Sequence, residues 1–324
     1  LGDVYKRQAW TSVISQIQRR GRDAYHSVAC TQDGIRWELH ASVLCLRGKE
    51  LTPQPITSQD GHLHLAWNGQ IFSSEHEDDS LLDMERNDGA IIMTRLEEHA
   101  DQIPDVLVST LSAVDGPYAF VLVDTRNACI YYGRDPLGRR SLLHTTTQGA
   151  WHLASVSGAA WKPHWKEVDC DALWQVTWGQ APARIPRRIS RSVLRAPCDD
   201  APDYAALVPD LQAVLSESVR QRVQKTRHAR IGLLFSGGLD CTVLAALTAQ
   251  HHAGPIDLIN VSFENPRAIA AAWAVAEAPV KHDAFPADPY AVPDRVTARE
   301  SYAQLAQLYP THTFRLVQVN VPYA

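Results

Sequence analysis

Short runs of apolar and β-branched residues, separated by turns, dominate the first half of the chain. Runs of this kind occur at 41–46, 62–67, 118–124, 128–132 and 151–155. Their length and composition predict strands of an antiparallel sheet. Two stretches with helical spacing, 90–98 and 103–111, interrupt the strands, and Pro104 suits the first turn of the second helix. Strand pairs combined with helices favour a layered α+β domain.

The second half of the chain alternates helical and strand-like patterns. Apolar residues spaced mostly by three and four predict an amphipathic helix over 204–225; they are Leu207, Leu211, Val214, Leu215, Val219 and Val223. The elements that follow are a buried strand at 231–235, a turn at 236–240, a helix through His251, a strand at 256–263, a helix at about 293–309 and a strand at 314–321. Strands joined by helices in this order predict a parallel sheet in an α/β domain.

A segment rich in proline and arginine, 176–203, separates the two patterns and shows no sustained period. Such a composition is typical of an irregular connector. A length of 324 residues also exceeds what one hydrophobic core usually covers. We therefore expect two domains, 9–175 and 204–324, joined by this connector.

The two ends of the chain fit neither pattern. The first eight residues, LGDVYKRQ, look like a translated adapter, and we exclude 1–8 from the fold as a non-native leader. The other end stops directly after the strand-like run 314–321, where an α/β domain would normally continue. We therefore expect a fragment whose second domain is incomplete.

Composition excludes several classes of protein. Hydrophobic residues make up 45% and charged residues 21%, as in ordinary soluble globular proteins. The apolar runs are shorter than the ~20 residues that cross a bilayer and no signal peptide opens the chain, so we expect a cytoplasmic protein with no membrane partner. A net charge of −5 disfavours nucleic acid as a partner. The six cysteines form no CxxC pair, which argues against a zinc site or a disulfide framework.

A glycine turn stands between the strand at 231–235 and the helix after it. Its sequence is Ser236-Gly237-Gly238-Leu239-Asp240-Cys241, and its glycines leave main-chain N–H groups uncovered at the positive end of a helix. It lacks the lysine of a P-loop and the third glycine of a dinucleotide-binding turn. A Gly-Gly helix entry can also be a simple tight turn.

This turn resembles the SGGxDS loop of the ATP pyrophosphatase superfamily. The resemblance implies that the loop grips the β- and γ-phosphates of ATP and releases pyrophosphate as AMP is transferred. Cys241 replaces the second serine of that loop, which removes a hydroxyl that can donate to phosphate.

Motifs at 66–72, 87–89 and 133–142 precede the loop, and together they resemble a class II glutamine amidotransferase domain. The resemblance implies an N-terminal-nucleophile (Ntn) hydrolase-like αββα sandwich. It also implies that Asn68 and Gly69 donate to the oxyanion, that Arg47 pairs with the α-carboxylate of glutamine, and that Asp88 receives its α-ammonium group. Fixed donors of this kind stabilise a tetrahedral intermediate, and the charge pairs are complementary.

Each piece of this set also has a simpler interpretation. Asn68-Gly69 is a common hairpin turn, and Arg47 or Asp88 alone would be a surface charge. The segment Arg134-Asp135, with Gly138, is expected to fix a loop rather than take part in catalysis.

The nucleophile of such a domain is an N-terminal cysteine whose own α-amine acts as the base. The first cysteine here is Cys30, which is internal and has no free α-amine. As printed, the chain should therefore not hydrolyse glutamine.

The pairing of the two domains is that of glutamine-dependent asparagine synthetases. Motifs at 67–73, 138–143, 255–261 and 293–295 resemble the asparagine synthetase domain-containing protein 1 family, with a fungal character. The resemblance implies that aspartate, glutamine and ATP yield asparagine, glutamate, AMP and pyrophosphate, with Mg²⁺ neutralising phosphate charge. The implied substrates are thus small molecules, and the oligomeric state is left open, with a homodimer as one candidate.

The ATP site implied by this family begins with the glycine loop. The loop residues expected to contact ATP are Ser236, Gly237, Gly238, Leu239, Asp240 and Cys241. Asp240 is a candidate magnesium ligand or simply a favourable helix N-terminal charge. Val261 and Ser262 lie where the edge of the sheet would meet adenine.

Two other functions are alternatives to that of a synthetase. One is a degenerate relative with a binding or regulatory role, which Gln70 in place of the usual glutamate and Cys241 in place of serine both favour. The other is a tRNA-modifying ATP pyrophosphatase, which would lack the glutaminase domain and which the acidic net charge disfavours.

Overall fold

The chain folds into two compact units, Leu1–Pro197 and Cys198–Ala324, referred to as unit 1 and unit 2. The computed structural model describes residues 2–32, 34–75, 79–147, 149–157, 165–187, 204–226, 228–264, 290 and 292–322. Of the connector expected at 176–203, residues 188–203 lie outside the described residues.

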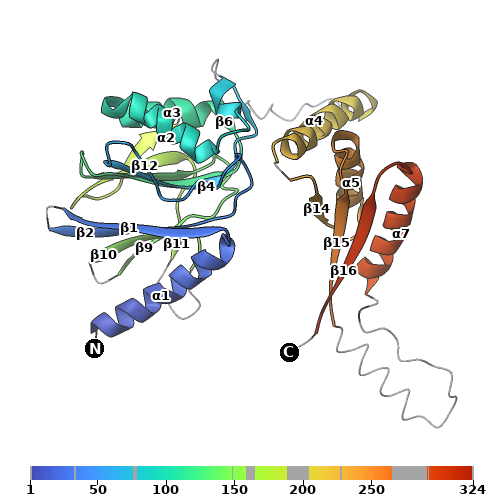
Figure 1. The fold of residues 1–324 in the computed structure, drawn as a ribbon, viewed down its shortest axis with the longest axis horizontal. Helices are drawn as coiled ribbons and strands as arrows, with labels where there is room; N and C mark the ends of the chain where they lie inside the picture. Colours follow the sequence, from blue (N-terminus) through green and yellow to red (C-terminus); the bar gives the residue numbers. More distant parts are fainter. Residues whose placement is uncertain are drawn as a thin grey trace, which may run out of the picture. The chain divides into compact units, whose positions relative to one another are not determined.

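Unit 1 is a four-layered α/β sandwich (Figure 1). Its elements are α1 (Gly2–Arg20), β1 (Ala24–Gln32), β2 (Ile35–Val43), β3 (Ile56–Thr57), β4 (Leu63–Gly69), β5 (Ser73–Ser74), η1 (Asp79–Leu82), α2 (Asp88–Glu98), η2 (Ala100–Gln102), α3 (Ile103–Ala113), β6 (Val114–Asp115), β7 (Tyr118–Asp124), β8 (Cys129–Arg134), β9 (Leu143–Thr147), β10 (Ala150–Ala154), β11 (Lys166–Glu167), β12 (Ala172–Thr177) and β13 (Ala183–Pro186).

Two layers of antiparallel strands form the middle of unit 1. The larger sheet has the order β13-β12-β8-β7-β4-β3, and the hairpin β1-β2 and the sheet β10-β9-β11 make the second layer. Helices α2 and α3 cover the larger sheet, and α1 packs against β2 on the other side. This arrangement confirms the predicted αββα sandwich.

The main core of unit 1 lies between the larger sheet and helices α2 and α3. It joins strand residues such as Leu65, Phe120 and Leu122 to the buried faces of the two helices. Helix α2 begins where it does because the Asn87 side-chain oxygen accepts hydrogen bonds from the first main-chain N–H groups, at 2.9 Å from Gly89 N. Helix α3 has its proline in the first turn, as expected.

Some predictions for unit 1 need correction. The strand expected at 41–46 is β2, which runs over Ile35–Val43 because it pairs along its whole length with β1 in a hairpin. Strand β1 was missed, since most of its side chains are exposed or half-buried and show no apolar alternation. Residues 2–8 are helical in α1, and their assignment to a non-native leader stays a prediction.

Unit 2 is built on a parallel sheet. Its elements are α4 (Tyr204–Gln224), β14 (Ile231–Leu234), α5 (Leu239–His251), β15 (Ile256–Phe263), α7 (Pro293–Leu308) and β16 (Phe314–Val321). The strand order is β14-β15-β16, and both pairings are parallel. Helices α5 and α7 bury small residues against the strands, including Ala245, Ala249 and Ala298 beside Phe235 and Leu258. The predicted parallel α/β domain is therefore confirmed.

Helix α4 buries only part of its apolar stripe. Val219 and Val223 pack with Leu247 of α5, whereas Leu211 and Val214 in the first half of the helix are exposed. The periodic pattern thus predicted the helix correctly but overstated how much of it is covered. Among the described residues, no helix combines the length and hydrophobicity that crossing a bilayer requires.

Candidate functional site

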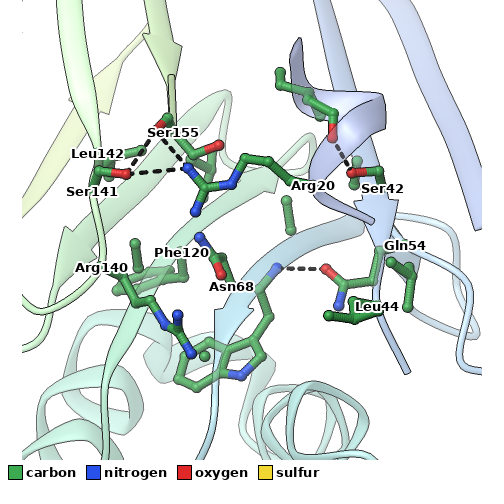
Figure 2. Close-up of a pocket in the computed structure, with 18 of the residues that line it drawn as sticks. Arg20, Ser42, Leu44, Gln54, Asn68, Phe120, Arg140, Ser141, Leu142 and Ser155 are labelled. Carbon is green, nitrogen blue, oxygen red and sulfur yellow. Dashed lines mark hydrogen bonds between the residues drawn. The ribbon is translucent and has the colours of Figure 1, made fainter. Parts of the chain in front are cut away.

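A pocket of about 270 Å³ lies between the two sheet layers of unit 1 (Figure 2). Strands β4 and β7 of the larger sheet, strands β2 and β10 of the second layer, and the start of α2 all contribute to its lining. The four residues expected to bind glutamine line it together: Arg47, Asn68, Gly69 and Asp88. These residues are far apart in the sequence, so only the sandwich brings them to one place.

Asn68 and Gly69 end strand β4 in register with Ala119 and Tyr118 of β7, so they form no hairpin turn. The Asn68 side chain points into the pocket and makes no hydrogen bond with another described residue. A Cβ atom on Gly69 would lie 2.7 Å from Tyr118 Cβ and 2.8 Å from Pro117 O. Close packing against β7 therefore requires glycine at 69, next to the Asn68 side chain that lines the pocket.

Arg47 and Asp88 form a buried pair in the pocket wall. Each side chain is 2% exposed, and Arg47 Nη1 lies 3.8 Å from Asp88 Oδ2. The two terminal nitrogens of Arg47 donate to the main-chain carbonyls of Ile71, Leu81 and Asp83 at 2.9–3.1 Å. Asp88 accepts a 3.0 Å hydrogen bond from Ile71 N. The terminal nitrogens of Arg47 and one carboxylate oxygen of Asp88 are thus already engaged in hydrogen bonds within the protein.

Burial shifts both members of this pair toward their neutral forms. Desolvation raises the pKa of Asp88, and the charge of Arg47 opposes that rise. Desolvation likewise lowers the pKa of Arg47, and Asp88 opposes that change. The charge of Arg47 and hydrogen bonds from main-chain N–H groups therefore favour the ionised form of Asp88.

The loop after β8 forms a scaffold behind the pocket. Arg134 donates to the carbonyls of Gly138 at 2.6 Å and Arg140 at 2.7 Å, and Asp135 is fully buried. Asp135 accepts hydrogen bonds from three main-chain N–H groups and from Arg139 Nε. Arg134 and Asp135 therefore fix a loop, as the sequence predicted.

The positions of the cysteines bear on catalysis. No cysteine occurs among the described residues that line the pocket. Cys30 is exposed on β1 and Cys45 is buried. The described residues thus contain the expected oxyanion donors without a thiol nucleophile beside them.

Several polar residues of the pocket had no site role in the sequence analysis, among them Arg20, Gln54 and Arg140. Gln54 Oε1 accepts a 2.7 Å hydrogen bond from Trp67 N and so supports the strand that carries Asn68. Arg20 Nη1 donates to Ser155 O at 3.2 Å. The arginines Arg20 and Arg140 were visible in the sequence, but the directions of their side chains were not.

In unit 2, the glycine turn joins β14 to α5, and most of its residues are exposed to solvent. The residues Ser236, Gly238, Leu239 and Asp240 are exposed, and Gly238 caps α5 without any side-chain hydrogen bond. Ser236 Oγ lies 3.5 Å from Cys241 Sγ and accepts a 3.3 Å hydrogen bond from Gly238 N. An uncapped helix N-terminus with nearby main-chain donors is suited to an anion.

Helix α7 packs directly against Gly237 of this turn. Gly237 has φ +82°, and a Cβ atom there would lie 2.4 Å from both Ala298 N and Thr297 C. Ser301 Oγ donates to Gly237 O at 2.8 Å. The turn therefore needs glycine at 237 for both its conformation and its contact with α7.

The two residues expected near adenine face different environments. Val261 is 40% exposed, whereas Ser262 is 1% exposed and lies 3.3 Å from Asn260 Oδ1. Asn260 also accepts a 2.6 Å hydrogen bond from Arg295 Nε, a buried arginine that holds the start of α7 to the strands. Of the pair, only Val261 can present its side chain to a ligand. In the sequence, Arg295 was only part of the motif at 293–295, and its hydrogen bonds to the strands could not be predicted.

Comparisons with known proteins match both units. The family model for a glutamine amidotransferase domain matches residues 41–160, and the model for asparagine synthase matches residues 210–306. The chain is 29% identical to the asparagine synthetase domain-containing protein YML096W of Saccharomyces cerevisiae over 97% of its own length. It is 25% identical to asparagine synthetase domain-containing protein 1 of Bos taurus over 98% of its length.

A more distant relative is the asparagine synthetase [glutamine-hydrolyzing] of Asparagus officinalis, 28% identical over 62% of this chain and 32% of that protein. The chain spans 57% of the length of the yeast relative and 66% of the cattle relative. The matches therefore cover both units while leaving part of each relative unmatched.

Proposed function

This chain belongs to the asparagine synthetase domain-containing protein family, and from that premise we propose that the protein is a glutamine-dependent amidotransferase of the asparagine synthetase class. The reaction would convert aspartate, glutamine and ATP to asparagine, glutamate, AMP and pyrophosphate. The observation that carries the proposal is the convergence of Asn68 and Gly69 on one pocket between the sheets of unit 1.

The glutaminase half would work through the end of β4. The side-chain amide of Asn68 and the main-chain N–H of Gly69 would donate to the oxyanion that forms when the amide of glutamine is attacked. Such donors accelerate the step because they are already in place before charge develops. The attacking thiol would be an N-terminal cysteine of the full-length protein, since Cys30 and Cys45 lie outside the pocket lining.

The synthetase half would use the glycine turn of unit 2. The asparagine synthase domain implies nucleotide binding of the ATP pyrophosphatase type. Main-chain N–H groups of the turn, Ser236 Oγ and the start of α5 would hold the phosphates, with Val261 the candidate contact for adenine. Adenylation would turn the aspartate carboxyl into an electrophile that ammonia can attack.

Asp240 is the residue of this turn that suits a magnesium ion. It is exposed in the first turn of α5, and Mg²⁺ in nucleotide sites is commonly held by one or two carboxylates together with phosphate oxygens. The ion would neutralise phosphate charge as pyrophosphate leaves. Within the described residues there is no cluster of three metal-ligating side chains, which fits a site completed by the nucleotide.

A second candidate is a binding or regulatory protein that keeps this fold without synthesis. The absence of a thiol among the described pocket residues and the replacement of the loop serine by Cys241 both favour it. The two candidates share ligand binding and differ in turnover, so separate measurements of binding and ammonia release distinguish them.

The first prediction concerns the chain as printed. We expect it to bind L-glutamine in titration calorimetry without releasing ammonia, because the donors are present and the thiol is not. Asn68→Ala should weaken binding about 3- to 10-fold through the loss of one hydrogen bond. Asn127→Ala makes the same change in a turn outside the pocket and should leave affinity unaltered. Equal affinities of Asn68→Ala and Asn127→Ala for L-glutamine would show that Asn68 does not contact the ligand.

A second prediction tests the phosphate loop. Cys241→Ser restores a hydroxyl at the start of α5, so the affinity for Mg-ATP should rise about 3- to 10-fold. Cys30→Ser makes the same chemical change on β1 of unit 1 and should have no effect. An unchanged or lower ATP affinity for Cys241→Ser would argue that the phosphates do not lie against this residue.

A further inference from the structure

A buried arginine opens helix α7 of unit 2. Arg295 lies in the first turn of this helix, and its side chain is 2% exposed. The helix dipole disfavours a cation at this end of a helix, and burying an unpaired charge is costly. An arginine nevertheless stays protonated in proteins. The position of Arg295 therefore depends on acceptors that the neighbouring strands supply.

Strands β15 and β16 supply these acceptors toward their carboxyl ends. Arg295 Nε donates to Asn260 Oδ1 at 2.6 Å. Its Nη1 donates to Asn320 Oδ1 at 3.1 Å and to Gln318 Oε1 at 3.3 Å, and its Nη2 donates to Val319 O at 3.0 Å. These four acceptors are neutral, so the directions of the hydrogen bonds hold the guanidinium group. A planar fork suits this task because its N–H groups are fixed relative to one another.

Asn260 extends this contact to the strand that leads into the glycine turn. Its side chain is 2% exposed, and its Nδ2 donates to Phe235 O at 2.9 Å and to Asp294 O at 3.4 Å. Phe235 directly precedes Ser236, the first residue of the turn. One side chain therefore links Arg295 to the point where the main chain enters the turn.

Helix α7 gives Arg295 a second connection to the turn. Gly237 packs against the main chain of Thr297 and Ala298, and Ser301 Oγ donates to Gly237 O at 2.8 Å. These residues follow Arg295 closely along the helix. A shift at the start of α7 would thus move the surface against which the turn packs.

We propose that Arg295 is a positioning residue for the turn at 236–241, which it holds in shape through Asn260 and through α7. The assignment rests on the proposed nucleotide site of unit 2 and adds the residue that fixes the shape of the turn before a ligand arrives. Most of the turn is exposed, so its main-chain donors need support from the buried residues behind them. Donors that are ordered before binding lose less conformational entropy when phosphate arrives. Arg295 itself is too deeply buried to contact the nucleotide.

Hydrogen exchange of the ligand-free full chain, measured by mass spectrometry, tests this role directly. Arg295→Met removes the donors and keeps an unbranched side chain, and it should raise exchange rates about 3- to 10-fold at 236–241 and at the start of α7. Exchange in α4 should stay unchanged. Arg299→Met is the matched control, because Arg299 also donates to Gln318 Oε1, at 3.1 Å, but is exposed and lies one turn further along α7. This control should leave exchange in the turn at the wild-type rate.

Titration calorimetry measures what the same contacts contribute to binding. Arg295→Met should weaken Mg-ATP about 3- to 10-fold and leave AMP unchanged, because AMP lacks the β- and γ-phosphates that the turn is expected to hold. Arg295→Lys keeps the charge without the fork, so its affinity for Mg-ATP should lie between those of wild type and Arg295→Met. If Arg295→Met does not fold, Arg295→Lys is compared with Arg299→Lys in both measurements.

The two measurements separate this role from the nucleotide function itself. Equal exchange at 236–241 in the Arg295 variant and its Arg299 control would overturn the assignment. Faster exchange throughout unit 2, or an equal loss of Mg-ATP and AMP binding, would also overturn it, because either result indicates a general loss of packing. Local acceleration at 236–241 in a protein whose wild type binds no Mg-ATP would support the positioning role and reject the nucleotide function.

Discussion

Replacing Asp135 by alanine is expected to destabilise unit 1 by about 3–5 kcal/mol. The carboxylate is fully buried and accepts hydrogen bonds from Tyr118 N, Leu137 N, Arg139 N and Arg139 Nε at 2.9–3.2 Å. Removing it leaves three main-chain N–H groups and Arg139 Nε without this acceptor, and buried donors without an acceptor carry large penalties. All but one of the nine tryptophans lie in unit 1, so urea unfolding followed by tryptophan fluorescence reports on this unit.

Asp115→Ala is the matched control for that variant. Asp115 lies 3.3 Å from the same arginine, Arg139, but its side chain is 56% exposed. Exposed pairs contribute at most about 1 kcal/mol, so the control should unfold close to the wild-type urea concentration. Similar midpoints for Asp135→Ala and Asp115→Ala would show that the buried loop network does not hold unit 1 together.

Gly237→Ala is expected to destabilise unit 2 by roughly 2–5 kcal/mol and to reduce ATP binding. The left-handed φ of +82° strains any side chain, and the added Cβ would lie 2.4 Å from the main chain of α7 at Thr297 and Ala298. The turn and helix must separate, which breaks the contact from Ser301 Oγ to Gly237 O. Hydrogen exchange measured by mass spectrometry should show faster exchange in α7, and calorimetry should show weaker Mg-ATP binding.

Gly238→Ala serves as the control in the same turn. Gly238 has φ −64°, and its added Cβ would meet only Ser236 Oγ at 3.4 Å, which is ordinary contact. We expect a stability change of no more than about 1 kcal/mol, the usual cost of placing alanine at a helix N-cap. Equal exchange rates in α7 for the two variants would contradict the view that α7 sets the shape of the turn.

The repeating patterns of the sequence predicted those elements whose environment is uniform along their length. Strand β7 is buried at most positions and β15 alternates regularly, and their expected ranges 118–124 and 256–263 agree with the structure. The expected range 314–321 also agrees with β16, although most positions of that strand are exposed. Strand β12 was missed, because it is half-buried at most positions and follows a stretch without a regular period. Its assignment depends on pairing with β8 and β13, which local pattern does not reveal.

The candidate sites show the same division between local and long-range information. Ser236 to Cys241 form one continuous turn whose chemistry can be read from adjacent residues, and the structure places it between β14 and α5. The pocket of unit 1 is assembled from strands separated by many residues. The identities of Asn68 and Gly69 were visible in the sequence, whereas the three main-chain carbonyls that engage the terminal nitrogens of Arg47 were not.

Hydrophobic periods and short motifs act over neighbouring residues, and they were enough to predict the two units and the glycine turn. Which buried polar groups have partners depends on how the chain packs in three dimensions. The terminal nitrogens of Arg47 are engaged because three main-chain carbonyls from distant positions in the chain lie around them. Hydrogen-bond partners are set by folding distant segments together, and that information is absent from any local pattern.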